Sequence, residues 1–464
     1  MICFHLDQAH LDSQRAHVIR LLWIALLSSS LHAAAPNIVL ILSDDQAWTD
    51  YSFMKHPKIQ TPALDKLAAE SLTYTRGYVT APLCRPSLAS LFTGLYTFQH
   101  GITGNDLLGK DGKKVSRSTP EGAKLHQQLY DRFGQCEGLA SELGKAGYIS
   151  MQAGKWWESD PKKSGFTYAM THGNPKRGAR HGDVGLEVSR KGIDQIRGFL
   201  DTAKNEQKPF FLWHAPFLPH TPHNPPKAHF DKYQALVDSP HVARYYAMVE
   251  WFDQTCGELL GELEKRGLSE NTVVIYVTDN GWIQRTDGPR FAPLSKQDVH
   301  EGGVRTPITI KWPGHIQPLI DKTTPVSSID IAPTILKIAG ADVPRAMTGI
   351  DLRDRAALKK RDTVYGADHS HDITGVDKRV ANLESRFIVR GEWKLIIYNP
   401  ANFPAPKIAG KSNGKANNPE GKPELYNLMN DPHETTNLAE KNPDQVIALS
   451  KLLNAWWDGS DPSK

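Results

Sequence analysis

The chain of 464 residues is long enough for one large hydrophobic core and a smaller one, because single cores stop growing beyond about 250 to 300 residues. Hydrophobic residues make up 39% and charged residues 23% of the sequence, which excludes a largely disordered chain and a multi-span membrane protein. A net charge of +4 suits an anionic substrate but is too small to indicate nucleic acid as a partner.

The first 35 residues are typical of an export signal. Arg15 and Arg20 precede the apolar run LLWIALLSSSL, and the small residues 33–35 follow it. The run is too short to span a bilayer, so we expect no integral membrane segment in the mature chain. A buried core helix is the alternative. We predict a signal peptide over residues 1–35 and delivery to the periplasm or the extracellular space.

Export leaves three cysteines in the mature chain, Cys84, Cys136 and Cys256. One disulfide is possible among them, for instance between Cys136 and Cys256, and one thiol then remains.

Strand and helix patterns alternate from the signal to about residue 340, which predicts an α/β layer architecture. The apolar runs NIVLILS (Asn37–Ser43) and NTVVIYVT (Asn271–Thr278) are typical of strands buried on both faces. Between them we expect a helix in CEGLASELGKAG that ends at Gly147. Two strands, YISMQAG and PFFLWHAP, follow that helix, and the strand TPITIKW and the helix SSIDIAPTILKIAG complete this part.

After about residue 360 the pattern changes to separated strands, as in RFIVRGEWKLIIYN. A polar loop at Gly410–Lys422 and a last helix near Asp444–Trp457 follow. We therefore predict a large α/β domain over 36–360 and a smaller α+β domain, with an antiparallel sheet and a terminal helix, over 361–464.

Both strong strands end in acids or amides: Asp44 and Asp45 follow the first, and Asp279 and Asn280 follow the second. Ligands gather outside the carboxyl ends of the strands in open α/β sheets. Either pair alone is typical of a turn, but two pairs at the ends of two apolar strands favour a site for a hard cation such as Ca²⁺ or Mg²⁺.

Cys84 begins a helical run in which Pro86 fits the first turn and Gly94 fits the position after the last turn. A helix N-terminus offers free backbone N–H groups to an anion and lowers the pKa of a thiol. A buried structural cysteine is the alternative, but the placement favours a nucleophile beside an anion site.

The segment CRPSLASLFTG resembles the motif of the type I sulfatases of the alkaline phosphatase superfamily, Cys-x-Pro-Ser-Arg followed by x-x-x-Leu-Thr-Gly. Six further segments come in the order found in that family and cover nearly the whole mature chain: PNIVLILSDDQ, GKWW, APFLPHTPHNPP, VTDNGW, HEGGVRTPITIKWPG and ELYNLMNDPHETTNLA. The resemblance implies a large mixed, mostly parallel sheet sandwiched by helices, with a smaller C-terminal α+β domain.

The resemblance also implies roles for single residues. A maturation enzyme would oxidise Cys84 to formylglycine, whose hydrate attacks sulfur. Lys155 and Lys296 match the lysines that bind sulfate oxygens, and His220 matches the histidine beside the leaving-group oxygen. Ca²⁺, favoured over Mg²⁺, would be held by five positions: Asp44, Asp45, the modified Cys84, Asp279 and Asn280.

These residue types suit sulfate ester hydrolysis on chemical grounds as well. A cation and two lysines neutralise the charge that grows in the transition state, and a histidine can donate the proton that an alkoxide leaving group needs.

Two positions depart from the family's pattern. Leu88 stands where the family has an arginine that assists maturation and holds the formylglycine, and Trp157 stands where it has a histidine beside the nucleophile. We hypothesise that His172 or His181 replaces the histidine. Arg85 or Arg180 is the weaker candidate for the arginine's charge, and a solvated basic loop over residues 170–183 is the alternative.

Trp156, Trp157 and Trp282 lie close to the motifs in the sequence, and aromatic rings often stack on sugars. Packing between helices explains them equally well. The predicted partner is therefore a sulfated carbohydrate, and the predicted function is an exported sulfatase. Two alternatives remain: a phosphate or phosphonate ester hydrolase of the same superfamily, and a catalytically impaired protein that binds sulfated glycans.

Overall fold

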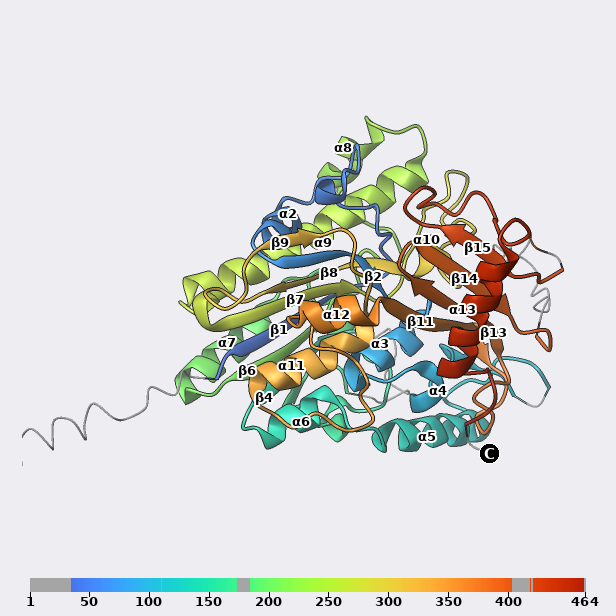
Figure 1. Cartoon of the computed structure of the whole chain (residues 1–464). Coiled ribbons are helices and arrows are strands. Elements are labelled where there is room, and N and C mark those ends of the chain that lie inside the picture. The colour runs from blue at the N-terminus through green and yellow to red at the C-terminus, as the bar shows by residue number, and fades with distance from the viewer. Residues whose placement is uncertain (1–34, 110, 173–183, 403–417, 419, 463–464) are drawn as a thin grey trace, which may run out of the picture. The chain divides into compact units, whose positions relative to one another are not determined.

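The computed structural model describes residues 35–109, 111–172, 184–402, 418 and 420–462 (Figure 1). Apart from Ala35, these residues belong to one compact unit, Pro36–Lys464. The predicted signal peptide, apart from Ala35, lies outside the described residues. Within the described residues, no helix combines the length and the apolar character needed to cross a bilayer.

A mixed β-sheet forms the centre of this unit (Figure 1). Its middle strand, β1, is parallel to both of its neighbours, β6 and β7, and β4 and β5 continue the parallel part beyond β6. Beyond β7, β8 runs antiparallel to both β7 and β2, and β9 and β10 pair with β2 in parallel. The strands are β1 (Asn37–Ser43), β2 (Leu72–Tyr78), β4 (Ile149–Gly154), β5 (Tyr168–Ala169), β6 (Phe210–Ala215), β7 (Thr272–Thr278), β8 (Arg305–Lys311), β9 (Leu319–Asp321) and β10 (Val326–Ser327).

The central strands are apolar on both faces because helices cover both faces of the sheet. Side chains alternate between the two faces along a strand. Leu40 of β1 and Ile275 of β7 belong to one core, and Val39 and Val274 belong to the other. This explains why these strands appear in the sequence as continuous apolar runs rather than as alternating patterns.

Two groups of helices cover the sheet. One face is covered by α2 (Pro62–Ala69), α7 (Asp194–Glu206) and α9 (Pro240–Lys265), with α8 (Lys227–Gln234) packed on α9. The other face is covered by α3 (Cys84–Thr93), α5 (Pro120–Gly134), α6 (Leu139–Lys145) and α11 (Ile331–Ala339). Shorter helices lie at α4 (Thr97–His100), α10 (Glu301–Val304) and α12 (Arg355–Arg361).

The C-terminal part forms a second, antiparallel sheet in the order β11-β13-β14-β15. Helix α13 (Pro443–Trp456) packs on it through Leu449 and Leu453. The strands are β11 (Thr363–His369), β13 (Leu383–Arg390), β14 (Trp393–Tyr398) and β15 (Glu424–Asn427), and a small two-stranded sheet pairs β3 (Asp106–Leu107) with β12 (Asp372–Ile373). The predicted fold class is confirmed, and the domain boundary at residue 360 stays a prediction.

No disulfide joins the three cysteines that lie in the described part of the chain. Cys84 and Cys256 are buried free thiols, and Cys136 is a half-buried one.

Candidate active site

Strands β1 and β7 bring their acidic ends together at one edge of the sheet. Ser43 and Thr278, the last residues of the two strands, are paired in register, so Asp44 and Asp45 lie beside Asp279. Asp45 adopts a left-handed backbone conformation (φ 66°), and its N–H donates to Asp279 Oδ1 at 3.1 Å. The clustering predicted for the two pairs is thus present.

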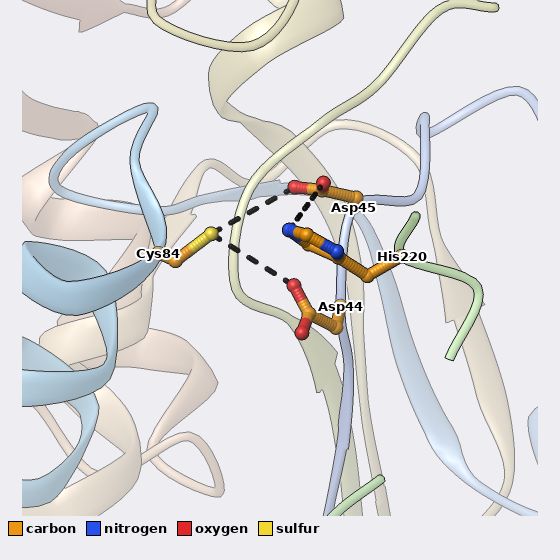
Figure 2. A group of neighbouring side chains, drawn as sticks. All are labelled: Asp44, Asp45, Cys84 and His220. Atoms are coloured by element: carbon orange, nitrogen blue, oxygen red, sulfur yellow. Dashed lines mark hydrogen bonds and ion pairs between the residues drawn. The ribbon is translucent and has the colours of Figure 1, made fainter. Parts of the chain in front are cut away.

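Cys84 begins helix α3, which ends at Thr93 before Gly94 (φ 64°) as predicted. Its sulfur lies 3.8 Å from Asp44 Oδ1 and 3.9 Å from Asp45 Oδ1 (Figure 2). Burial raises the pKa of the thiol to about 12, although two neighbouring lysines act to lower it. Desolvation thus outweighs the lowering that a helix N-terminus gives to the pKa of a thiol.

The two predicted lysines pair with the two aspartates. Lys155 Nζ lies 2.8 and 2.7 Å from the carboxylate oxygens of Asp44. Lys296 Nζ lies 2.6 Å from each carboxylate oxygen of Asp45 and 3.2 Å from the sulfur of Cys84. Both ammonium groups are buried, so their charges act at short range with little screening by water.

His220 approaches the same carboxylates from the loop after β6. Its Nδ1 lies 2.6 Å from the carbonyl oxygen of Thr221, which makes Nδ1 the donor, and its Nε2 lies 3.3 Å from Asp45 Oδ2 (Figure 2). The ring stacks on Phe217 at 4.2 Å between centroids. Burial lowers the pKa of His220 to about 4, against the opposing effect of Asp45 and Asp44.

Crowding gives the carboxylates different acidities. Burial, followed by the charge of Asp279, raises the pKa of Asp44 to about 7. Burial also acts to raise the pKa of Asp45, but Lys296, His220 and Lys155 outweigh it and lower this pKa to about 2. Burial raises the pKa of Asp279 as well. Burial and mutual repulsion thus oppose the ionisation of all three acids at this sheet edge.

The same cluster fits a hard cation. Asp279 Oδ2 and Asn280 Oδ1 are buried and accept no hydrogen bond, although the Lys155 ammonium lies 3.6 Å from Asp279 Oδ2. The Asn280 amide donates its N–H groups to Asp45 Oδ1 and to the Gly281 carbonyl, which leaves its oxygen facing the cluster. Buried oxygens without partners are rare and costly unless an ion or water satisfies them. Carboxylate and amide oxygens are the ligands that Ca²⁺ prefers. Potential ligand atoms of Asp44, Asp45, Cys84 and His220 also lie within 4.8 Å of one another.

The two departures from the family pattern are neighbours in space. Leu88 and Trp157 line one narrow cavity beside α3, together with the aromatic rings of Trp156 and Phe133 and the charged pair Arg85 and Glu158. Trp157 is 3% exposed and has the Lys155 ammonium 5.9 Å from its ring centroid. Burial therefore leaves this ring, like Trp156 and Trp282, without an open face for a sugar.

The structure describes some, but not all, of the residues proposed to compensate for these departures. The guanidinium of Arg85 is buried and paired with both carboxylate oxygens of Glu158, at 2.5 and 2.8 Å, so Glu158 already balances its charge. His172 is half-buried at the last described position before a gap. His181 and Arg180 lie outside the described residues, and compensation by either histidine stays a prediction.

Arg190 is a site residue that the sequence did not indicate. One of its amino groups donates to the carbonyl oxygens of Phe217 at 2.8 Å and of His220 at 3.3 Å. The other donates to the side chain of Asn224. Arg190 thus holds the loop that carries His220. Its surroundings in the sequence, SRKG, are typical of a surface turn and gave no signal of this contact.

Comparison with known proteins agrees with this geometry. The Sulfatase family profile matches residues 36–341, and the profile of the N-sulphoglucosamine sulphohydrolase C-terminal region matches residues 291–401. The chain is 27% identical over 448 residues to an ulvan-active sulfatase of Formosa agariphila, covering 92% of this chain and 80% of that protein.

A second relative is the N-acetylgalactosamine-6-sulfatase of Sus scrofa, with 27% identity over 482 residues, covering 94% of this chain and 88% of that protein. The crystal structure of PsFucS1 sulfatase from Pseudoalteromonas sp. matches the fold with a TM-score of 0.67 at 21% identity, covering 93% of this chain and 92% of that one. The chain therefore belongs to the sulfatase family of the alkaline phosphatase superfamily and is a sulfuric ester hydrolase.

Proposed function

We propose that this protein is an exported sulfatase that removes O- or N-linked sulfate from a carbohydrate, using a bound Ca²⁺ and a formylglycine formed from Cys84 by a maturation enzyme. One observation carries the proposal: Lys296 contacts the sulfur of Cys84, and Lys155 and His220 contact the two aspartates that lie 3.8 and 3.9 Å from that sulfur. An anion site, a nucleophile position and a proton donor are thus collected at one buried point.

The ligand set proposed for Ca²⁺ consists of Asp44, Asp45, the modified Cys84, Asp279 and Asn280. When bound, the ion supplies positive charge that stabilises the sulfate oxygens and the nucleophile. Formylglycine at position 84 would supply, as its hydrate, a nucleophilic hydroxyl toward sulfur and a second hydroxyl for the release of sulfate. The buried oxygens of Asp279 and Asn280 that accept no hydrogen bond support this assignment.

Lys155 and Lys296 would hold the sulfate oxygens. Their ammonium groups reach the nucleophile position from different loops, after β4 and before α10. Because both are buried, they would stabilise negative charge in the transition state more strongly than exposed lysines do.

His220 would donate the proton to the leaving oxygen. Its Nδ1–H is fixed on the Thr221 carbonyl, which leaves Nε2 facing the site. Without ligand the ring is neutral at pH 7, since its pKa is lowered to about 4. A sulfate bound beside it adds negative charge, which favours the protonated ring that the acid role requires.

The carbohydrate part of the proposal rests on the relatives. One is described as acting on ulvan and another on N-acetylgalactosamine 6-sulfate. The anion-binding lysines do not distinguish sulfate from phosphate by themselves, so the test must include both.

Mass spectrometry of the tryptic peptide Gly77–Lys110, from protein made in its native host, tests maturation directly. We expect an aldehyde at Cys84. The same preparation should hydrolyse an aryl sulfate faster than the matched aryl phosphate, and Cys84→Ala should abolish this activity. An intact thiol on every copy would contradict the formylglycine mechanism, and preferential cleavage of phosphate would favour an ester hydrolase of the other class.

A further inference from the structure

The loop that carries Lys296 is fixed by contacts with other parts of the chain. It runs from Trp282 to His300, between β7 and α10, and contains no helix or strand. Leu294 and Gln297 both adopt left-handed backbone conformations (φ 59° and 64°). Residues other than glycine rarely adopt this conformation unless surrounding contacts stabilise it. The Gln297 N–H donates to the Pro82 carbonyl at 2.8 Å, two residues before Cys84, which fixes one end of the segment.

His300 connects the other end of this loop to the C-terminal sheet. Its Nδ1 lies 2.5 Å from Asp298 Oδ1, within the loop, and its Nε2 lies 3.0 Å from Glu424 Oε2 on β15. Glu424 also accepts hydrogen bonds from the hydroxyls of Tyr398, at 3.0 Å, and Tyr426, at 2.7 Å. All of these groups are buried, so the histidine bridges two carboxylates out of reach of water.

Lys394 makes a second bridge one residue further along. Its ammonium lies 3.1 Å from Glu301 Oε1 and 2.9 Å from Glu434 Oε1. Glu434 also accepts the backbone N–H of Glu301 at 2.5 Å. The side chains of Lys394, Glu301 and Glu434 are 0%, 1% and 1% exposed. Tyr78 and Arg305 complete the surroundings through Glu301 Oε2, at 3.2 and 3.4 Å.

Such bridges are costly ways to join two parts of a protein. Removing charged groups from water requires close pairing, and apolar packing of the same volume often stabilises a fold equally well. Charged pairs, however, fix the position of the joined segments more tightly, because a shift leaves a buried charge without its partner. The two bridges hold His300 and Glu301, which lie four and five residues after Lys296 in the chain.

Building on the proposed function, we propose that His300 and Lys394 are positioning residues: they tie the Lys296 loop to the C-terminal sheet and so set the place of the Lys296 ammonium beside Cys84. The sheet then contributes to sulfate binding without touching the substrate. Misplacing a catalytic group by about 1 Å can reduce the rate about 100-fold.

A double-mutant cycle tests this proposal. We expect Lys394→Met to lower kcat/KM on a sulfated substrate by about 10- to 100-fold at a temperature where the variant is folded. In a Lys296→Ala background the same substitution should change kcat/KM less than twofold, because Lys394 acts through Lys296. An equal loss in both backgrounds would show a general structural effect and overturn the proposal.

A control lysine, less buried than Lys394, is available at the end of strand β8 in the central sheet. Lys311 also lies on a strand and pairs with a glutamate, Glu70, at 2.6 Å, but it has no contact with the Lys296 loop among the described residues. Lys311→Met should leave kcat/KM unchanged. If Lys394→Met does not fold, Glu434→Gln keeps the shape of the network, removes one charge and should give the same pattern in both backgrounds.

Titration calorimetry with inorganic sulfate separates this proposal from the proposed function. Weaker sulfate binding in Lys394→Met than in wild type, absent in the Lys296→Ala background, supports positioning even if no sulfated substrate is turned over. A wild type that binds sulfate no better than Lys296→Ala does would overturn the positioning proposal. Turnover without that binding difference would leave the proposed function standing.

Discussion

Leu88 and Trp157 line the same narrow cavity beside the helix that begins at Cys84. The resemblance places an arginine and a histidine at these two positions in type I sulfatases. Here both polar groups are replaced together by apolar ones that share one wall. The two departures therefore lie at one place in the fold, and we expect their effects on packing to be coupled.

This relationship predicts that restoring the arginine alone is harmful. Leu88→Arg introduces a second guanidinium into a cavity where Arg85 already balances the charge of Glu158, and a buried charge without its own partner costs about 3 to 5 kcal/mol. We expect urea denaturation to show a loss of that order in the free energy of unfolding. The control is Leu236→Arg at a side chain that is 46% exposed, which should change stability by less than about 0.5 kcal/mol. Near-wild-type stability of Leu88→Arg would contradict the packing explanation.

The lysines give a prediction for catalysis. Lys155→Met removes a buried cation that contacts Asp44 and, in the proposed mechanism, the sulfate. We expect kcat/KM to fall by about 100- to 1000-fold, as for loss of one transition-state donor. Lys163→Met, at an exposed position eight residues along the chain, is the control and should retain wild-type kinetics. Equal rates for both variants would exclude Lys155 from the site.

The metal site gives a prediction for pH. In protein stripped of metal by a chelator, the raised pKa of Asp44, about 7, exceeds the ordinary value of 3.8. The folded protein then holds a proton that the unfolded chain releases, so this group's contribution to stability is present below pH 4 and is lost as the pH rises toward 7. Asp44→Asn removes that dependence. The stability of the variant relative to wild type should therefore rise between pH 4 and pH 7.

Urea unfolding of both proteins at several pH values in this range, with chelator and with added Ca²⁺, measures the effect. Added Ca²⁺ should flatten the dependence, because a bound cation favours the ionised carboxylate. A stability difference that is independent of pH in the chelated proteins would contradict the crowding of carboxylates described above.

Much of the fold was predictable because its signals are local. The apolar runs of β1 and β7, and the pair Pro86 and Gly94 at the two ends of α3, are short patterns whose structural meaning does not depend on the rest of the chain. The meeting of the acids followed from one general rule, that parallel strands end at the same edge of a sheet.

The remaining site features depend on distant contacts. Arg190 holds the His220 loop from 30 residues away, and Lys394 reaches Glu301 across 93 residues. No local sequence pattern predicts contacts between side chains so far apart in the chain. The raised pKa of the Cys84 thiol was not predictable for a related reason. The helix N-terminus is visible in the sequence, but the burial that outweighs its effect is a property of the folded site.

The role of His220 predicts a dependence on the leaving group. A proton donor matters most when the departing oxygen is a poor leaving group, as in a sugar alcohol, and little when it is a good one, as in a nitrophenol. His220→Gln should therefore lower kcat on a sulfated sugar by about 100-fold or more and lower it much less on nitrophenyl sulfate. His315→Gln, at an exposed histidine, should leave both rates unchanged. Because the Nδ1 of His220 is fixed by Thr221, the loss would come from Nε2, the atom that faces Asp45 and the nucleophile position. Equal losses on the two substrates would assign His220 to binding rather than to proton transfer.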